Sequence, residues 1–357
     1  MSEKNVSEVR YFAACNSCRG FVSFYDDVFS GLNRLYIIKG GPGTGKSRLM
    51  RDVAADAVSR GYRAELYYCS SDPNSLDGLI LPELSVGLLD GTSPHAREPQ
   101  FPGIRDEIIN LGAFWNGDAL LLRRTEIEDL MLQKNRKYIQ CYHYLNALQS
   151  VNIACNRLVF DAVNTEKIRT CADRILKNLK SGDVFQKRYG LRSAVSMRGY
   201  VTLPTYEEIA QNRIVIRDRY RTAPLLLGAL LKAVEQKKQI CTVSPCPIDP
   251  DVLEAIYIPS LDLSVYTDYA TCASDADASL IHMDRFLSAE ALRQNRAKLR
   301  FGKRCSQALL ESANEELSEI GQLHFQLESI FTAAMNFAKK EALTADLISE
   351  IYANRRN

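Results

Sequence analysis

The sequence has few of the features that mark several common classes of protein. Its 357 residues include only 4 histidines and 1 tryptophan, and the formal net charge is +2. A protein that binds nucleic acid through a strongly basic face is therefore not indicated. The longest apolar run, residues 223–234, has about half of the length that crosses a bilayer. Neither a membrane nor nucleic acid is an expected partner.

The N-terminus and the cysteines indicate a cytoplasmic protein. Residues 1–8 are polar and contain no apolar signal segment. In the cytoplasm the 10 cysteines are expected to be reduced thiols. Cys15 and Cys18 have the spacing of a redox pair or of half a zinc site, but no second Cys-x-x-Cys exists. Incidental thiols are the favoured interpretation, with metal binding and redox chemistry as alternatives.

The chain contains two copies of one sequence pattern. Three segments of the first half recur in the second half, the first two after 179 residues and the third after 177: 19–23 recurs at 198–202, 33–37 at 212–216 and 72–77 at 249–254. Several short matches in one register, with a single two-residue slip, indicate an internal duplication. A Ser-Gly-Asp break near 181–187 separates the copies, so we expect domains 1–183 and 184–357.

Each copy alternates strands with a helix, and the two copies share one order of elements. The predicted strands are 35–39, 64–69 and 84–89 with a helix at 45–59, then 214–217, 240–244 and 261–266 with a helix at 224–236. Such alternation predicts an α/β fold with a parallel sheet in each copy. Long helical stretches follow the third strand of each copy and predict helical hairpins or small bundles appended to the two cores.

The first copy contains Gly40-x4-Gly45-Lys46-Ser47, the P-loop (Walker A) pattern for nucleoside triphosphates. Its glycines allow successive amide groups to point at one anion, and the following helix adds its positive N-terminal end. Lys46 would neutralise the β and γ phosphates, and the Ser47 hydroxyl would ligate Mg²⁺. The residues expected to contact the nucleotide are Gly40, Gly41, Pro42, Gly43, Thr44, Gly45, Lys46, Ser47 and Arg48.

A carboxylate that holds the magnesium shell is expected at the end of a neighbouring strand. The segment 85–90, Ser-Val-Gly-Leu-Leu-Asp, fits this description and ends at Asp90. Lys46 and Asp90 are thus the predicted catalytic residues, and Ser47 and Asp90 the predicted metal ligands. The alternative is an ordinary turn aspartate before Gly91.

The second copy lacks this chemistry. Leu225 stands at the lysine position and Thr267 at the Asp90 position, so the cradle and the carboxylate are missing together. We therefore expect a degenerate site that binds no nucleotide in the usual way. Its loop carries three arginines, and one of them could reach the first site as an arginine finger, although a solvated loop is the favoured interpretation: Arg217, Arg219 and Arg221.

Segments 39–47, 68–78 and 88–95 resemble a family of bacterial tandem P-loop proteins labelled ATPases, within the P-loop NTPase superfamily. Through the repeat, the resemblance covers essentially the whole chain. It implies nucleotide binding but no established substrate. Members of the family carry a P-loop in both halves, whereas here the second is degenerate. The loop is also similar to that of AAA-type ATPases, but Gly91 stands where their catalytic glutamate would be.

We expect Mg²⁺-dependent ATP binding and hydrolysis at the single intact loop, with an unidentified protein or small-molecule partner on the helical regions. The absence of an Asn-Lys-x-Asp tetrapeptide favours ATP over GTP. A small-molecule or nucleotide kinase and a non-catalytic nucleotide sensor are the alternatives. Candidate general bases are Glu83, Asp72 and Asp77, and His95 could face the γ-phosphate, while the other histidines are interpreted as isolated helix residues: His143, His282 and His324.

Overall fold

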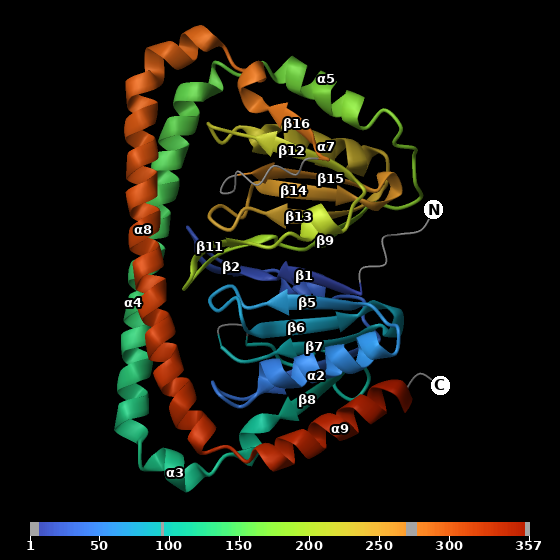
Figure 1. Ribbon diagram of the computed structural model, residues 1–357, viewed down its shortest axis with the longest axis vertical. Coiled ribbons are helices and arrows are strands. Elements are labelled where there is room, and N and C mark those ends of the chain that lie inside the picture. Colours follow the sequence, from blue (N-terminus) through green and yellow to red (C-terminus); the bar gives the residue numbers. More distant parts are fainter. Residues whose placement is uncertain (1–6, 94–95, 269–276, 354–357) are drawn as a thin grey trace.

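The computed structural model describes residues 7–93, 96–268 and 277–353, so His95 lies outside the described residues. Two six-stranded sheets stand one beyond the other, and two long helices run along one side of both (Figure 1). The predicted α/β class and two-module arrangement are therefore confirmed.

The first sheet has the strand order β1–β5–β6–β7–β4–β8. Its strands are β1 (Glu8–Phe12), β4 (Arg34–Lys39), β5 (Ala64–Tyr68), β6 (Leu76–Leu81), β7 (Val86–Asp90) and β8 (Asp106–Asn110). Strand β6 is antiparallel to both of its neighbours, whereas the other pairs are parallel. The prediction of a wholly parallel sheet is therefore wrong. The Asp-Pro segment is a tight turn, with Ser75 N donating to Asp72 O over 2.9 Å, and it sends the chain straight back as β6.

The second sheet repeats this topology in the order β16–β12–β15–β14–β13–β9. Its strands are β9 (Gln186–Tyr189), β12 (Asn212–Arg217), β13 (Ile240–Pro245), β14 (Leu253–Ile258), β15 (Leu263–Asp268) and β16 (Ser279–His282). Here β14 is the antiparallel strand, as β6 is in the first sheet. The sheets meet beside β1 and β9, where Phe12 and Leu191 exchange backbone hydrogen bonds of 2.8 and 3.0 Å.

Short elements also recur in both halves. Each half has a two-stranded hairpin, a one-turn helix and two 3₁₀ turns: β2 (Ala14–Ser17), β3 (Gly20–Ser23), α1 (Tyr25–Val28), η1 (Pro82–Leu84) and η2 (Leu111–Phe114), then β10 (Ser193–Ser196), β11 (Gly199–Thr202), α6 (Thr205–Glu208), η3 (Pro259–Leu261) and η4 (Met283–Phe286). These matches agree with the duplication seen in the sequence.

One helix covers a face of each sheet. Helix α2 (Lys46–Ser59) packs its buried Leu49, Met50 and Val53 into the first core. Helix α7 (Ala223–Gln236) has the same 14-residue length and buries the matching positions of the second core: Leu226, Leu227 and Leu230. The apolar spacing of three and four residues produces one buried stripe on each helix.

Two long antiparallel helices connect the halves. Helix α4 (Arg124–Phe160), which follows the short α3 (Gly117–Leu121), has 37 residues, and α8 (Ala289–Ala333) has 45. At 1.5 Å per residue they extend about 55 and about 67 Å, which is long enough to pass both sheets. They pack through a buried seam made of Cys141, Leu145, Leu148, Ala313, Leu317 and Ile320. In the described ranges, no helix combines the length and apolar content needed to cross a bilayer.

The helices that follow α4 and α8 exchange partners. Helix α5 (Thr165–Ile175) packs on α7 in the second core, and α9 (Phe337–Ala353) packs on α2 in the first core. The prediction of a helical hairpin appended to each core is therefore wrong. Each long helix exceeds the height of one sheet, so it delivers the next helix to the opposite half (Figure 1).

Candidate functional site

The glycine-rich loop, residues 40–47, connects β4 to α2. Gly43 and Gly45 have φ values of 70° and 83°, in the left-handed region that favours glycine. Thr44 Oγ1 donates to the Gly41 carbonyl over 2.9 Å and closes the turn. No side chain caps α2 at Gly45, so the amide groups of its first turn face the loop. This backbone has the shape of an anion cradle.

Lys46 lies over this loop. Its Nζ donates to the carbonyl oxygens of Gly40 and Gly41, over 2.7 and 2.8 Å. The same Nζ is 3.5 Å from Asp90 Oδ2, and both side chains are largely buried. The fold therefore brings together the lysine and the carboxylate that the sequence predicts as partners.

Asp90 ends β7, which runs parallel to β4 and beside it. Its Oδ1 accepts hydrogen bonds from the backbone N and the Oγ1 of Thr92, over 2.9 and 2.6 Å. Burial raises the pKa of Asp90, Asp77 raises it further, and Lys46 and Thr92 oppose the shift. A carboxylate held in this way gains from a nearby positive charge.

The remaining predicted contacts divide into two groups. Ser47 Oγ accepts from the backbone N of Leu76 over 2.9 Å, which ties the start of α2 to β6. Pro42 is partly buried within the loop. Arg48 is exposed and its Nε lies 2.9 Å from Asp52 Oδ1, so its side chain turns along α2 and only its backbone belongs to the loop.

Helices from both halves cover the loop. A Cβ placed on Gly43 would lie 2.6 Å from the Glu328 carbonyl oxygen and 2.5 Å from Thr332 Oγ1, both on α8. One placed on Gly41 would lie 3.2 Å from the Trp115 ring, which contacts Phe331 at a centroid distance of 5.2 Å. Substituting either glycine would therefore push against the second half of the chain.

Three ionisable side chains that the sequence did not single out for this site also lie near Lys46. They are Lys134 on α4 and both His324 and Glu328 on α8. Burial lowers the pKa of His324 to about 4, with Lys134 and Lys46 adding to the shift. Burial also raises the pKa of Glu328 and lowers that of Lys134, and Lys46 acts on both. Only the pairing of α4 with α8 reveals that these positions face the loop.

The candidate general bases are now separated. Glu83 lies in η1, where its Oε2 accepts from the backbone N of Arg63 at the start of β5. This is the end of the sheet opposite to Asp90, which excludes Glu83. Asp77 is buried in β6 and acts electrostatically on Asp90, and Asp72 acts in the same way on Glu328. Asp77 and Asp72 therefore remain near the loop.

The corresponding loop of the second half is closed by its own carboxylate. Asp218 accepts from the backbone N of Tyr220 over 3.0 Å and from the backbone N of Ala223 over 2.5 Å. Because α7 begins at Ala223 as α2 begins at Lys46, Ala223 holds the lysine position, and the assignment of Leu225 there is wrong.

Thr267 does hold the Asp90 position. It pairs with Ile216 of β12 as Asp90 pairs with Ile38 of β4. Its Oγ1 donates to the Glu254 carbonyl over 3.2 Å. Because no carboxylate or lysine occupies the corresponding positions, this half lacks the chemistry of the first loop.

The arginine finger from the second half is wrong for a single chain. Arg219 lies 3.6 Å from Asp284 Oδ2 in its own half, and Arg217 is exposed at the end of β12. Burial raises the pKa of Cys155 on α4 and Arg221 opposes this shift, so Arg221 lies near Cys155. Cys155 follows Lys134 by 21 residues of continuous helix, a distance of about 31 Å.

Cys15 and Cys18 have the character of structural thiols. Cys15 is fully buried and burial raises its pKa, as it does for Cys18. Protonated thiols are poor nucleophiles and poor metal ligands. Over the residues that the structure describes, no group of three or more His, Cys, Asp or Glu side chains could hold a metal ion.

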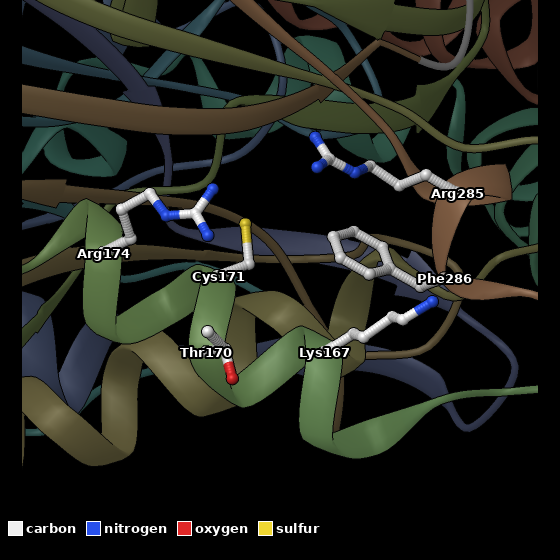
Figure 2. A pocket seen from close by; sticks show the side chains of 6 residues that line it. All are labelled: Lys167, Thr170, Cys171, Arg174, Arg285 and Phe286. Carbon is white, nitrogen blue, oxygen red and sulfur yellow. The ribbon is translucent and has the colours of Figure 1, made fainter.

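A surface pocket lies in the second half, away from the glycine-rich loop. Figure 2 shows the guanidinium groups of Arg174 and Arg285 on either side of the Cys171 sulfur. The pocket lies between α5 and η4, and it is lined by Lys167, Thr170, Cys171, Arg174, Arg285 and Phe286. None of the predicted site residues lines it. No family model, no curated protein and no solved structure matches this chain.

Proposed function

We propose that this protein binds ATP with Mg²⁺ at the loop of residues 40–47 and hydrolyses it. The observation that carries the proposal is the position of Lys46, on the loop carbonyls and 3.5 Å from Asp90. A lysine and a carboxylate at the ends of adjacent elements, around a glycine-rich helix start, are the parts of a phosphoryl-transfer site.

Each part would have a separate role. The loop amides and the start of α2 would bind the phosphates, and Lys46 would exchange its carbonyl contacts for phosphate oxygens. The Ser47 hydroxyl and the Asp90 carboxylate are hard oxygen donors of the kind that Mg²⁺ prefers, directly or through water. When bound, Mg²⁺ would neutralise charge that develops on the phosphates.

The motifs of the loop are consistent with membership of the bacterial tandem P-loop ATPases, with the second loop degenerate. A partner is supported by apolar side chains exposed along the long helices, which include Met131, Leu132, Ile139, Ile153, Phe160, Phe301 and Phe325. The class of that partner stays open.

A nucleotide sensor is the second candidate function, because α8 touches the loop directly. Thr332 Oγ1 donates to the Gly43 carbonyl over 3.4 Å, at one end of a 45-residue helix that begins beside the other sheet. A loop that moves on binding nucleotide would therefore displace an element that belongs to the second half.

Two measurements on the purified protein test the proposal. Binding of a fluorescent ATP analogue with Mg²⁺ and production of ADP are compared between the wild type and Lys46→Ala. We expect saturable binding and steady turnover, with both lost in the variant. Binding without turnover would favour the sensor or a kinase that lacks its acceptor, and wild-type protein that binds no nucleotide would overturn the proposal.

A further inference from the structure

The long helices obey the internal repeat as closely as the sheets do. Asn116 N donates to Ala334 O, and Ser288 N donates to Ala162 O, each over 2.8 Å. These matched bonds fix a spacing of 172 residues between α4 and α8. Every side chain near the glycine-rich loop thus has a counterpart at the other end of the helix pair.

Those counterparts are chemically different. Near the loop the helix pair carries ionisable side chains, and at the far end it carries neutral ones: Lys134 corresponds to Ser306, His324 to Asn152 and Glu328 to Asn156. The neutral set is satisfied locally, because Ser306 Oγ donates to Asn152 Oδ1 over 3.0 Å. The second half therefore lost its lysine, its carboxylate and these helix charges together, while the helix packing was retained.

Lys134 faces the loop. One turn further along α4, the Tyr138 hydroxyl donates to Ser71 Oγ over 3.1 Å, in the turn that follows β5. Lys134 interacts electrostatically with Lys46 and with the Cys69 thiol at the end of β5. In the parts of the chain that the structure describes, no carboxylate lies within ion-pair distance of Lys134. Two lysines held beside one anion cradle suit a ligand with several negative charges.

We propose that Lys134 binds the terminal phosphate of a nucleoside triphosphate, so that the α4–α8 pair distinguishes ATP from ADP. This inference rests on the proposed function. Lys46 extends from the start of α2, whereas Lys134 approaches from a helix packed against the loop, so the two ammonium groups contact the phosphate chain from different elements. ADP retains the contacts with the loop and lacks the group that Lys134 binds.

The test compares affinities for a non-hydrolysable ATP analogue and for ADP, both with Mg²⁺, so that it does not depend on turnover. The variant is Lys134→Ser, which introduces the residue found at the equivalent position 306. We expect a loss of about tenfold or more for the analogue, as for one charge-assisted contact, and less than about twofold for ADP. Lys134→Arg should keep most of the preference for the analogue.

Two controls separate the possible failures. Ser306→Ala, at the far end, should change neither affinity, and Lys46→Ala should weaken both ligands. If Lys134→Ser weakens both ligands equally, or neither, the role of Lys134 is overturned while ATP binding stands. If the wild type binds neither ligand, the proposed function fails, and this inference fails with it.

Discussion

The two halves of this protein have the same scaffold but different chemistry. Both have a six-stranded sheet of one topology, a 14-residue helix on its face and a long helix along its side. Lys46 and Asp90 occur in the first half, where the second has Ala223 and Thr267. The fold therefore does not require these side chains, which separates their role from structure.

The helix starts show how the second half compensates. Asp218 accepts two backbone N–H groups at the start of α7, so an internal carboxylate satisfies donors that the first half leaves facing its loop. Side chains that bind a ligand in one half can thus be replaced by side chains that only stabilise the other. Each prediction below breaks or sharpens this contrast.

The largest effect is expected at Asp90. Asp90→Asn keeps the size of the side chain and its acceptor for Thr92, but it removes the charge that would hold Mg²⁺. Turnover should fall by about 100-fold or more, with nucleotide binding changed only a few-fold. Thr267→Val, at the matching position, should leave turnover unchanged. An Asp90→Asn enzyme with full Mg²⁺-dependent activity would remove Asp90 from the mechanism.

Gly43 tests the contact between the loop and α8. Gly43→Ala adds a Cβ 2.5–2.6 Å from α8 at a residue with φ 70°, so we expect a loss of roughly 2–4 kcal/mol in unfolding free energy. Gly61→Ala is the matched control, because φ there is 85° and nothing lies within 4 Å. It should cost only about 1 kcal/mol. Equal losses in urea titrations would mean that α8 yields freely.

His324 should make stability depend on pH. Its folded pKa of about 4 lies below the value of about 6.5 for an unfolded chain. The unfolded chain therefore binds the proton first, and the unfolding free energy falls as the pH drops from about 6.5 to about 4, by at most about 3 kcal/mol. His324→Asn should flatten this part of the profile, whereas His143→Asn, at an exposed site, should not. Identical profiles for all three proteins would contradict the burial of His324 as a neutral group.

The smallest effect is expected at Asp218. Asp218→Ala removes the internal cap of α7 and should lower the unfolding free energy by about 1 kcal/mol, measured by thermal denaturation. Asp218→Asn keeps an acceptor and should lose less. Nucleotide affinity should not change in either variant, and a change would show that the second loop takes part in binding.

The sequence predicted the features that depend on local patterns. The loop at 40–47, Asp90 and the duplication were all readable, because each rests on neighbouring residues or on a repeated register. The antiparallel β6 was missed, since Leu76–Leu81 follows a turn with no helix to mark a new strand. The exchange of α5 and α9 was also missed, and with it Lys134, His324 and Glu328. Their place beside Lys46 depends on α4 pairing with α8, which no local pattern encodes.

The central claim is that one half of this duplicated chain binds nucleotide and the other does not. Isothermal titration of Mg²⁺-ATP into the wild type, Lys46→Ala and Asp218→Ala counts the sites directly. We predict one site per chain in the wild type, none in Lys46→Ala and one in Asp218→Ala. Two sites in the wild type, or one that persists in Lys46→Ala, would contradict the account.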